Sequence, residues 1–147
     1  TADDTLGKKL EPGAPPVSKR FQAMDVLAEQ GIHTGIAMMP VLPFIEDDEE
    51  NIRRIVEQAH AHGADYILPW FGMSLRDRQR AYYYDKLDRL FPGLRDRYEQ
   101  TFGNQYHCAV PNADRLTEVF QELCDGYGIA TCMKRYEPAA GTQMKLF

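Results

Sequence analysis

The chain has 147 residues, 44% of them hydrophobic, and a formal net charge of -5 at pH 7. This length suffices for one modest core and is too short for most complete (β/α) barrels. The negative charge argues against a nucleic-acid binder with a wholly basic surface, and no apolar run approaches the roughly 18 residues of a membrane span. We therefore expect a soluble, cytoplasmic protein that does not interact with membranes.

The first half of the chain alternates between helical and strand patterns. Residues 15–31 predict a helix, because proline is tolerated in an opening turn and a glycine ends the segment. Residues 32–39 are almost wholly apolar, as in a parallel strand covered on both faces. A second helix over residues 47–63 begins with an acidic run, and residues 66–71 are the next apolar segment. This order predicts a parallel α/β fold.

The second half of the chain is predicted to be mainly helical. Ser74 and Asp77 have the spacing of a capping box at the start of a third helix. A short helix over residues 94–102 follows, then a loop and a longer helix that begins at Asn112. Residues 129–132 have the composition of a last strand.

The predicted sheet lacks partners. Two or three parallel strands cannot by themselves cover both faces and satisfy both edges of a sheet. The missing partners would be earlier strands in a missing N-terminal half of a barrel, or a second copy of the chain in a homo-oligomer.

A series of motifs in the first half resembles a known enzyme family. Residues 10–15, Leu-Glu-Pro-Gly-Ala-Pro, are followed by Arg20, by Gly31-Ile32 and by the apolar stretch of residues 35–45. This combination is similar to the second half of a radical S-adenosylmethionine (AdoMet, SAM) barrel of the spore photoproduct lyase-like group, also called DNA repair photolyase-like. The resemblance covers residues 1–75 well and the remainder weakly.

The resemblance implies both a fold and an activity. The fold would be a partial, TIM-like (β/α) radical SAM barrel segment over residues 1–75, a helical C-terminal extension over residues 76–136 and a flexible tail over residues 137–147. Enzymes of this family hold a [4Fe-4S] cluster on a CxxxCxxC loop and cleave AdoMet reductively to a 5′-deoxyadenosyl radical. This chain has no such loop. We therefore expect the C-terminal fragment of a DNA-repair lyase-like enzyme, inert and free of cofactor without its N-terminal half.

The resemblance also implies which residues face the cofactor and the substrate. Residues 1–15 would be the loop after the fourth barrel strand, and Arg20 on the next helix would pair with the methionyl carboxylate or, structurally, with Glu11. The exit of the fifth strand would pack against the adenine, although an apolar strand is also typical of a core. Trp70 would stack on a substrate ring or simply pack. Contact with AdoMet is thus expected for Glu11, Arg20, Met38, Pro40 and Leu42.

No catalytic residue or metal ligand is expected in this chain. His60 and His62 are two positions apart on a helix, so their side chains diverge and make a poor metal pair. Cys108, Cys124 and Cys132 have the loose spacing C-x15-C-x7-C, which suits reduced thiols better than an auxiliary cluster.

The segment of residues 75–99 is the best candidate for DNA contact. It carries seven cations and five anions with interleaved tyrosines, and arginine binds phosphates while aromatic rings stack on bases. The alternating charges are equally typical of a solvated helix held by its own ion pairs, which is the interpretation that we favour.

The last five residues resemble a peptide motif that binds the bacterial sliding clamp. Gln143, Leu146 and Phe147 match the pattern Q-x-x-L-F, in which the two apolar side chains enter a pocket. The alternatives are a disordered tail and a tail whose Phe147 packs on the parent domain. Two other classes therefore remain open, a DNA-associated interaction module and an ordinary α/β-barrel hydrolase or lyase fragment.

Overall fold

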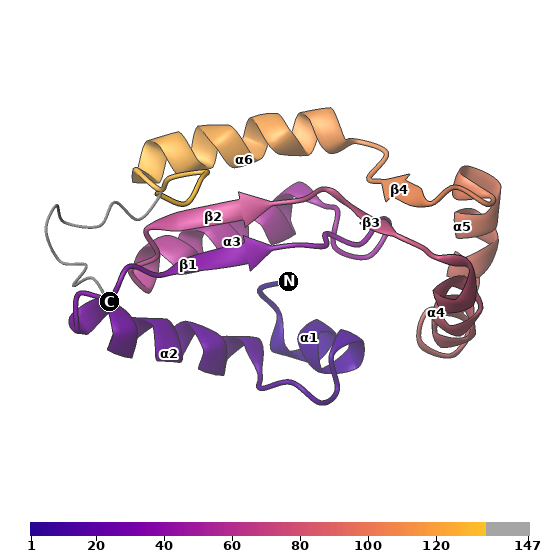
Figure 1. The fold of residues 1–147 in the computed structure, drawn as a ribbon, viewed down its shortest axis with the longest axis horizontal. Helices are drawn as coiled ribbons and strands as arrows, with labels where there is room; N and C mark the ends of the chain where they lie inside the picture. Colours follow the sequence, from indigo (N-terminus) through magenta and orange to yellow (C-terminus); the bar gives the residue numbers. More distant parts are fainter. Residues whose placement is uncertain (135–147) are drawn as a thin grey trace, which may run out of the picture.

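The structure is a computed structural model that describes residues 1–134. Helices and short strands alternate along the chain (Figure 1). Their order is α1 (Asp4–Leu10), α2 (Val17–Glu29), β1 (Gly35–Met38), α3 (Glu49–Ala61), β2 (Tyr66–Pro69), β3 (Gly72–Ser74), α4 (Asp77–Leu90), α5 (Leu94–Phe102), β4 (His107–Ala109) and α6 (Ala113–Tyr127). None of these helices is long and apolar enough to cross a membrane.

The centre of the fold is a parallel pair of strands. β1 pairs with β2 from Gly35 opposite Tyr66 to Met38 opposite Pro69, and α3 forms the crossover between them. On the far side of β2 from β1, Tyr66 forms an isolated parallel bridge with Ala130. The predicted mixed α/β class with parallel strands is therefore confirmed, whereas the barrel segment stays a prediction.

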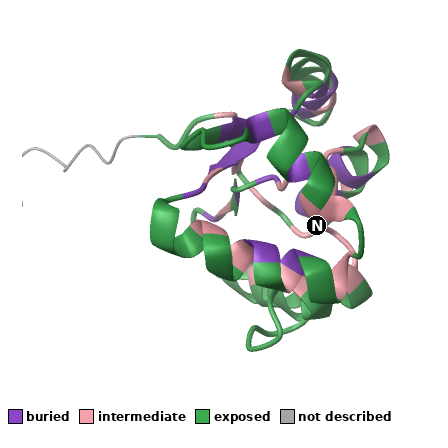
Figure 2. Ribbon diagram, turned by 90° about the vertical axis from the view of Figure 1, so that its right-hand side faces the viewer, coloured by how far each residue is buried: buried purple, intermediate pink, exposed green. Residues whose placement is uncertain are grey.

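The main hydrophobic core lies between this sheet, α3 and α6. α3 begins where the side chain of Asp48 accepts a hydrogen bond of 2.8 Å from the Asn51 amide, as a helix cap does. Its apolar residues recur at helical spacing and are buried against α6, while the opposite faces of the helices are exposed (Figure 2). The core residues are Met38, Val41, Ile52, Ile55, Val56, Ala59, Ile67, Val110, Leu116, Phe120, Cys124 and Ile129.

A second core joins the short strands to α4 and α5. β3 and β4 pair antiparallel, with Met73 opposite Cys108. Tyr84 and Leu87 from α4 and Tyr98 from α5 are buried beside them. The region predicted as a helical extension thus contributes to both cores, because α4 and α5 form the second core and α6 packs against α3 in the first.

Several local predictions were wrong. Residues 4–10, expected in a loop, form α1, whose first turn is capped by the Asp3 side chain at 2.6 Å from the Leu6 amide. β4 lies within the expected loop before α6, and the expected last strand is reduced to the bridge at Ala130. α4 begins without a side-chain cap, since Arg76 and not Ser74 precedes its first turn.

Candidate functional site

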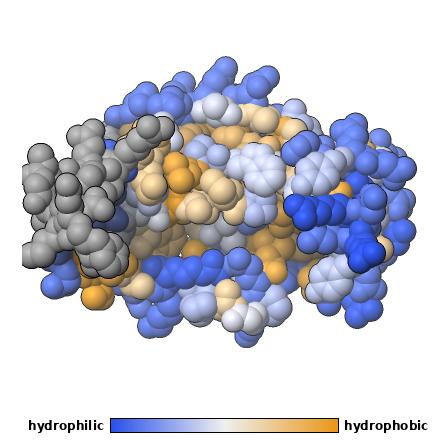
Figure 3. Space-filling view, in the orientation of Figure 1, coloured by the Kyte–Doolittle hydropathy of each residue, from blue (hydrophilic) through white to orange (hydrophobic). Residues whose placement is uncertain are grey.

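A cavity of about 720 Å³ lies among the N-terminal helices, β1 and α4. Its walls come from the end of α1, the start of α2, β1 with the loop that follows it, and the C-terminal half of α4. Hydrophobic side chains show between α2 and the rest of the molecule in the space-filling view (Figure 3). The volume is typical of sites for small molecules.

All five residues expected to contact AdoMet line this cavity. Met38 is buried at the end of β1, Leu42 is half-buried and Pro40 is exposed in the loop after the strand. Glu11 and Arg20 lie on the opposite wall, where the chain passes from α1 into α2. The cavity therefore brings together two groups of residues. Glu11 and Arg20 lie near the start of α2, and Met38, Pro40 and Leu42 come after α2 in the sequence.

Arg20 is held by a short local network. One of its Nη atoms pairs with Glu11, and its Nε donates a hydrogen bond of 3.1 Å to the Pro15 carbonyl oxygen. Both charged side chains are about half exposed. The structural pair that the sequence suggested for Arg20 is present, while its contact with a cofactor stays a prediction.

The loop after β1 is attached to the end of β2. The Trp70 amide donates to the Met38 carbonyl oxygen at 3.1 Å, and the Val41 amide donates to the Trp70 carbonyl oxygen at 3.0 Å. The indole of Trp70 is 42% exposed and does not line the cavity. Trp70 thus positions one cavity wall through its backbone, and its contact with a substrate stays a prediction.

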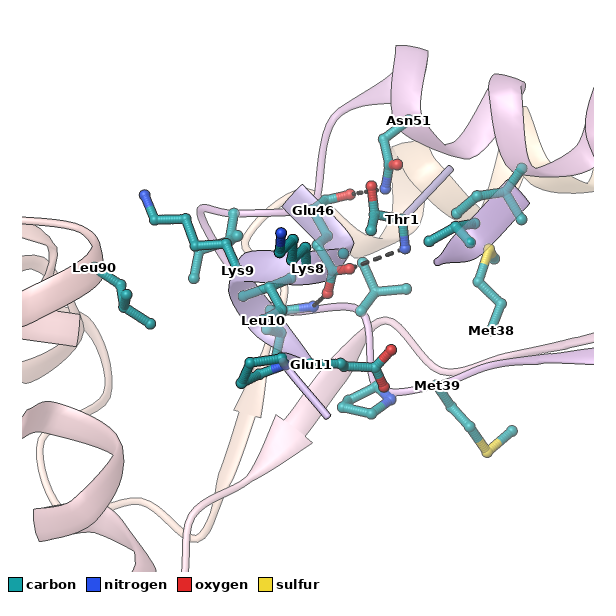
Figure 4. Close-up of a pocket in the computed structure, with 18 of the residues that line it drawn as sticks. Thr1, Lys8, Lys9, Leu10, Glu11, Met38, Met39, Glu46, Asn51 and Leu90 are labelled. Atoms are coloured by element: carbon teal, nitrogen blue, oxygen red, sulfur yellow. Dashed lines mark hydrogen bonds and ion pairs between the residues drawn. The ribbon is translucent and has the colours of Figure 1, made fainter. Parts of the chain in front are cut away.

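A buried carboxylate at the cavity wall, Glu46, was not predicted from the sequence. Glu46 is 7% exposed, and its two carboxylate oxygens accept hydrogen bonds from the backbone nitrogens of Thr1, at 3.0 Å, and Leu42, at 3.1 Å (Figure 4). Asn51 supports the same contact, because its side chain donates to the Glu46 carbonyl oxygen at 2.8 Å and accepts from the Ala2 amide at 3.2 Å. Together they attach residues 1–2 to the loop after β1.

A hydrogen-bonded pair of tyrosines links the α4 wall of the cavity to the loop after β1. Tyr83 lines the cavity, and its hydroxyl donates at 3.0 Å to the hydroxyl of Tyr98, which donates at 2.6 Å to the Pro43 carbonyl oxygen. Burial raises the pKa of Tyr83 to about 12 and raises that of Tyr98 as well. Both hydroxyls are therefore protonated donors at neutral pH.

The end of the cavity between α1 and α4 is basic. Lys8, Lys9 and Lys86 line it. The Lys9 ammonium lies 4.0 Å from the centre of the Phe91 ring, and that of Lys86 lies 5.2 Å from the centre of the Tyr82 ring. Lys86 and Tyr82 belong to the cationic segment of residues 75–99, but their position near Lys8 and Lys9 was not predicted, since these lysines belong to helices far apart in the chain.

The cysteines and histidines do not form a metal centre in residues 1–134. No group of three potential ligands lies together there, and Cys108, Cys124 and Cys132 are free thiols. Burial raises the pKa of Cys108 and raises that of Cys124 to about 11, so both are protonated at neutral pH. The ring of His62 does not pair with His60, because its Nδ1 lies 2.8 Å from a carboxylate oxygen of Asp25.

Many arginines of residues 75–99 are engaged within the protein. Arg89 pairs with Asp85 at 2.9 Å, and Arg95 pairs with Asp88 at 3.0 Å and Glu99 at 2.8 Å. These contacts agree with the interpretation of residues 75–99 as a solvated segment held by its own ion pairs. Contact of this segment with DNA stays a prediction. The clamp-motif residues Gln143, Leu146 and Phe147 lie outside the described residues.

Comparisons with protein-family models, curated proteins and solved structures found no match for this chain. Its function is therefore inferred from its motifs and from the cavity. The cavity combines an apolar wall at β1, an arginine-glutamate pair at α2 and a basic end at α4.

Proposed function

We propose that this chain is the C-terminal part of a radical AdoMet enzyme and that the β1 end of the cavity binds AdoMet. The observation that carries the proposal is that Glu11, Arg20, Met38, Pro40 and Leu42, taken from separate motifs, line one cavity. The parallel β1-α3-β2 unit, in which this wall follows the end of a strand, also supports it.

The residues of the cavity fit the chemistry of AdoMet. Met38, Met39 and Pro40 provide an apolar surface for a purine, and the strand end provides backbone polar groups. The Arg20 guanidinium suits a carboxylate, and Glu11 suits an ammonium or sulfonium cation. A volume of about 720 Å³ accommodates a molecule of this size.

The residues of the cavity do not fit an iron-sulfur cluster, because no cysteine lines it. The proposal assigns the cluster ligands to a polypeptide segment before Thr1. With one electron from such a cluster, AdoMet would be cleaved to methionine and would supply a carbon radical for hydrogen abstraction from a substrate. This chain would contribute binding and orientation, with Arg20 and Glu11 holding polar groups and the Met38 wall excluding water.

The experiment begins with the reading frame that precedes Thr1. The proposal expects a CxxxCxxC motif there, and it expects the extended protein to form 5′-deoxyadenosine from AdoMet after anaerobic reconstitution. Arg20→Gln should raise the KM for AdoMet about tenfold, the loss that accompanies one charge-assisted hydrogen bond. Arg53→Gln is the matched control, since Arg53 is exposed on α3 and does not line the cavity.

Two results would contradict the proposal. One is a preceding reading frame without the cysteine motif. The other is an extended protein with a full cluster that forms no 5′-deoxyadenosine, or whose KM for AdoMet responds equally to Arg20→Gln and Arg53→Gln.

A further inference from the structure

The basic end of the cavity has charges that the protein does not neutralise itself. The ion pairs of residues 1–134 engage arginines, histidines and the backbone nitrogen of Thr1, and none of them includes Lys8, Lys9 or Lys86. The carboxylates that line the cavity are already occupied, because Glu11 pairs with Arg20 and Glu46 accepts from two backbone nitrogens. The three lysines therefore leave a local excess of positive charge in a chain whose net charge is -5.

The lysines come from two helices that line the same cavity. Lys8 and Lys9 are consecutive on α1, and Lys86 lies on α4. The Lys9 ammonium stands over Phe91, which directly follows α4. In Figure 4, Lys9 and Leu90 lie away from Met38 and Met39, and Lys8 lies between these two groups, beside Leu10.

The contacts of these lysines supply no counter-charge. An ammonium over an aromatic ring is attracted to the negative face of the ring, which carries no net charge. Lys9 and Lys86 are held in this way by Phe91 and Tyr82. Ammonium groups bind phosphate as point charges, and a doubly charged phosphate can engage several of them at once.

The surroundings favour a small ligand over a polynucleotide. A polynucleotide needs a track of free cations along the surface, but Arg89 and Arg95 on the adjoining helices pair with carboxylates of their own region. Arg80 is likewise engaged, by the carbonyl oxygens of Leu75, Gly103 and Gln105. Lys8, Lys9 and Lys86, by contrast, line a cavity and have no carboxylate partner within the described part of the chain.

We propose that the α1–α4 end of the cavity binds the phosphate group of a small phosphorylated molecule through Lys8, Lys9 and Lys86. Tyr82, which is 66% exposed beside Lys86, offers a ring face to an adjoining planar group of that molecule. This molecule would be the substrate of the enzyme only if the proposed function holds. The phosphate site itself does not depend on that function.

Calorimetric titration of the 147-residue chain tests the site with inorganic pyrophosphate, uridine 5′-monophosphate and uridine. Both phosphates are expected to bind saturably and uridine is not. Lys9→Gln and Lys86→Gln should each weaken phosphate binding about tenfold, since each removes a charge-assisted contact. Lys19→Gln is the control, because Lys19 contacts Gln22 on α2, does not line the cavity and carries the same charge. Circular dichroism verifies that each variant is folded.

Three outcomes would overturn the site. They are the absence of phosphate binding by the folded chain, an equal loss of affinity in Lys19→Gln and Lys86→Gln, and binding of a single-stranded oligonucleotide without binding of either small phosphate. A failure of the AdoMet experiment with phosphate binding intact would reject the proposed function and leave the phosphate site standing.

Discussion

The hydroxyl of Tyr98 donates a hydrogen bond of 2.6 Å to the carbonyl oxygen of Pro43. The two residues are 55 positions apart, and the bond attaches α5 to the loop that forms one wall of the cavity. Tyr98 is fully buried, and its ring also packs against Phe44 edge to face at 5.4 Å between ring centres. The second core therefore determines where the wall after β1 stands.

Tyr98→Phe is expected to lower the free energy of unfolding by about 1–2 kcal/mol, because the Pro43 carbonyl and the Tyr83 hydroxyl both lose a buried partner. Urea denaturation measures the change. Tyr82→Phe is the control, since the Tyr82 side chain is 66% exposed. Equal stabilities of the two variants would contradict the assigned role of Tyr98.

Arg80→Ala is expected to destabilise the protein by about 2 kcal/mol. The guanidinium donates to three backbone carbonyl oxygens, of Gln105 at 2.6 Å, Gly103 at 2.8 Å and Leu75 at 3.2 Å, and so ties α4 to the end of the β3–β4 pair where β3 ends and β4 begins. Arg80→Lys should not restore stability, because an ammonium lacks the planar set of donors. Arg78→Ala, an exposed change on the same helix, should be near neutral in the same denaturation experiment.

Stability should fall above pH 9 in part because of Cys124. Burial raises the pKa of this thiol from 9.0 to about 11, so folding favours the protonated form. The stabilisation that comes from keeping this thiol protonated in the folded state is complete below pH 9 and is lost as the pH rises toward 11. Unfolding free energies across this interval should decline less steeply in Cys124→Ala than in the wild type; parallel profiles would exclude the thiol as a cause.

The chain is expected to self-associate through β1. In the described part of the chain β1 pairs with β2 alone, and Ile32 and Met39, next to its two ends, are 50% and 44% exposed. Light scattering should detect a dimer that Ile32→Lys and Met39→Lys weaken. Met133→Lys, which charges an exposed methionine outside this strand, should leave the dimer intact, and a monomeric wild type at micromolar concentration would reject the prediction.

Local sequence patterns determined the elements of the first half. The apolar residues 32–39 and 66–71 predicted two parallel strands, and the helical pattern that ends at Gly63 predicted the helix between them. The elements β1, α3 and β2 confirm these predictions. This succeeded because burial on both faces leaves a continuous apolar run and because helix ends carry local caps. The glycine after α2 and the glycine after α6 adopt positive φ angles, as helix-ending glycines do.

Contacts between distant segments decided the rest. β3 and β4 are only three residues long, which is too short for a strand periodicity to be recognised in the sequence. They pair because the second core holds them together. Glu46 directly precedes the acidic helix start and carried no signal of its own, yet its carboxylate is buried because residues 1–2 and the loop after β1 converge on it. The basic end of the cavity exists because folding brings Lys9 beside the end of α4. Residue types and local elements are properties of short segments, whereas a cavity and its charge depend on which segments the tertiary structure brings together.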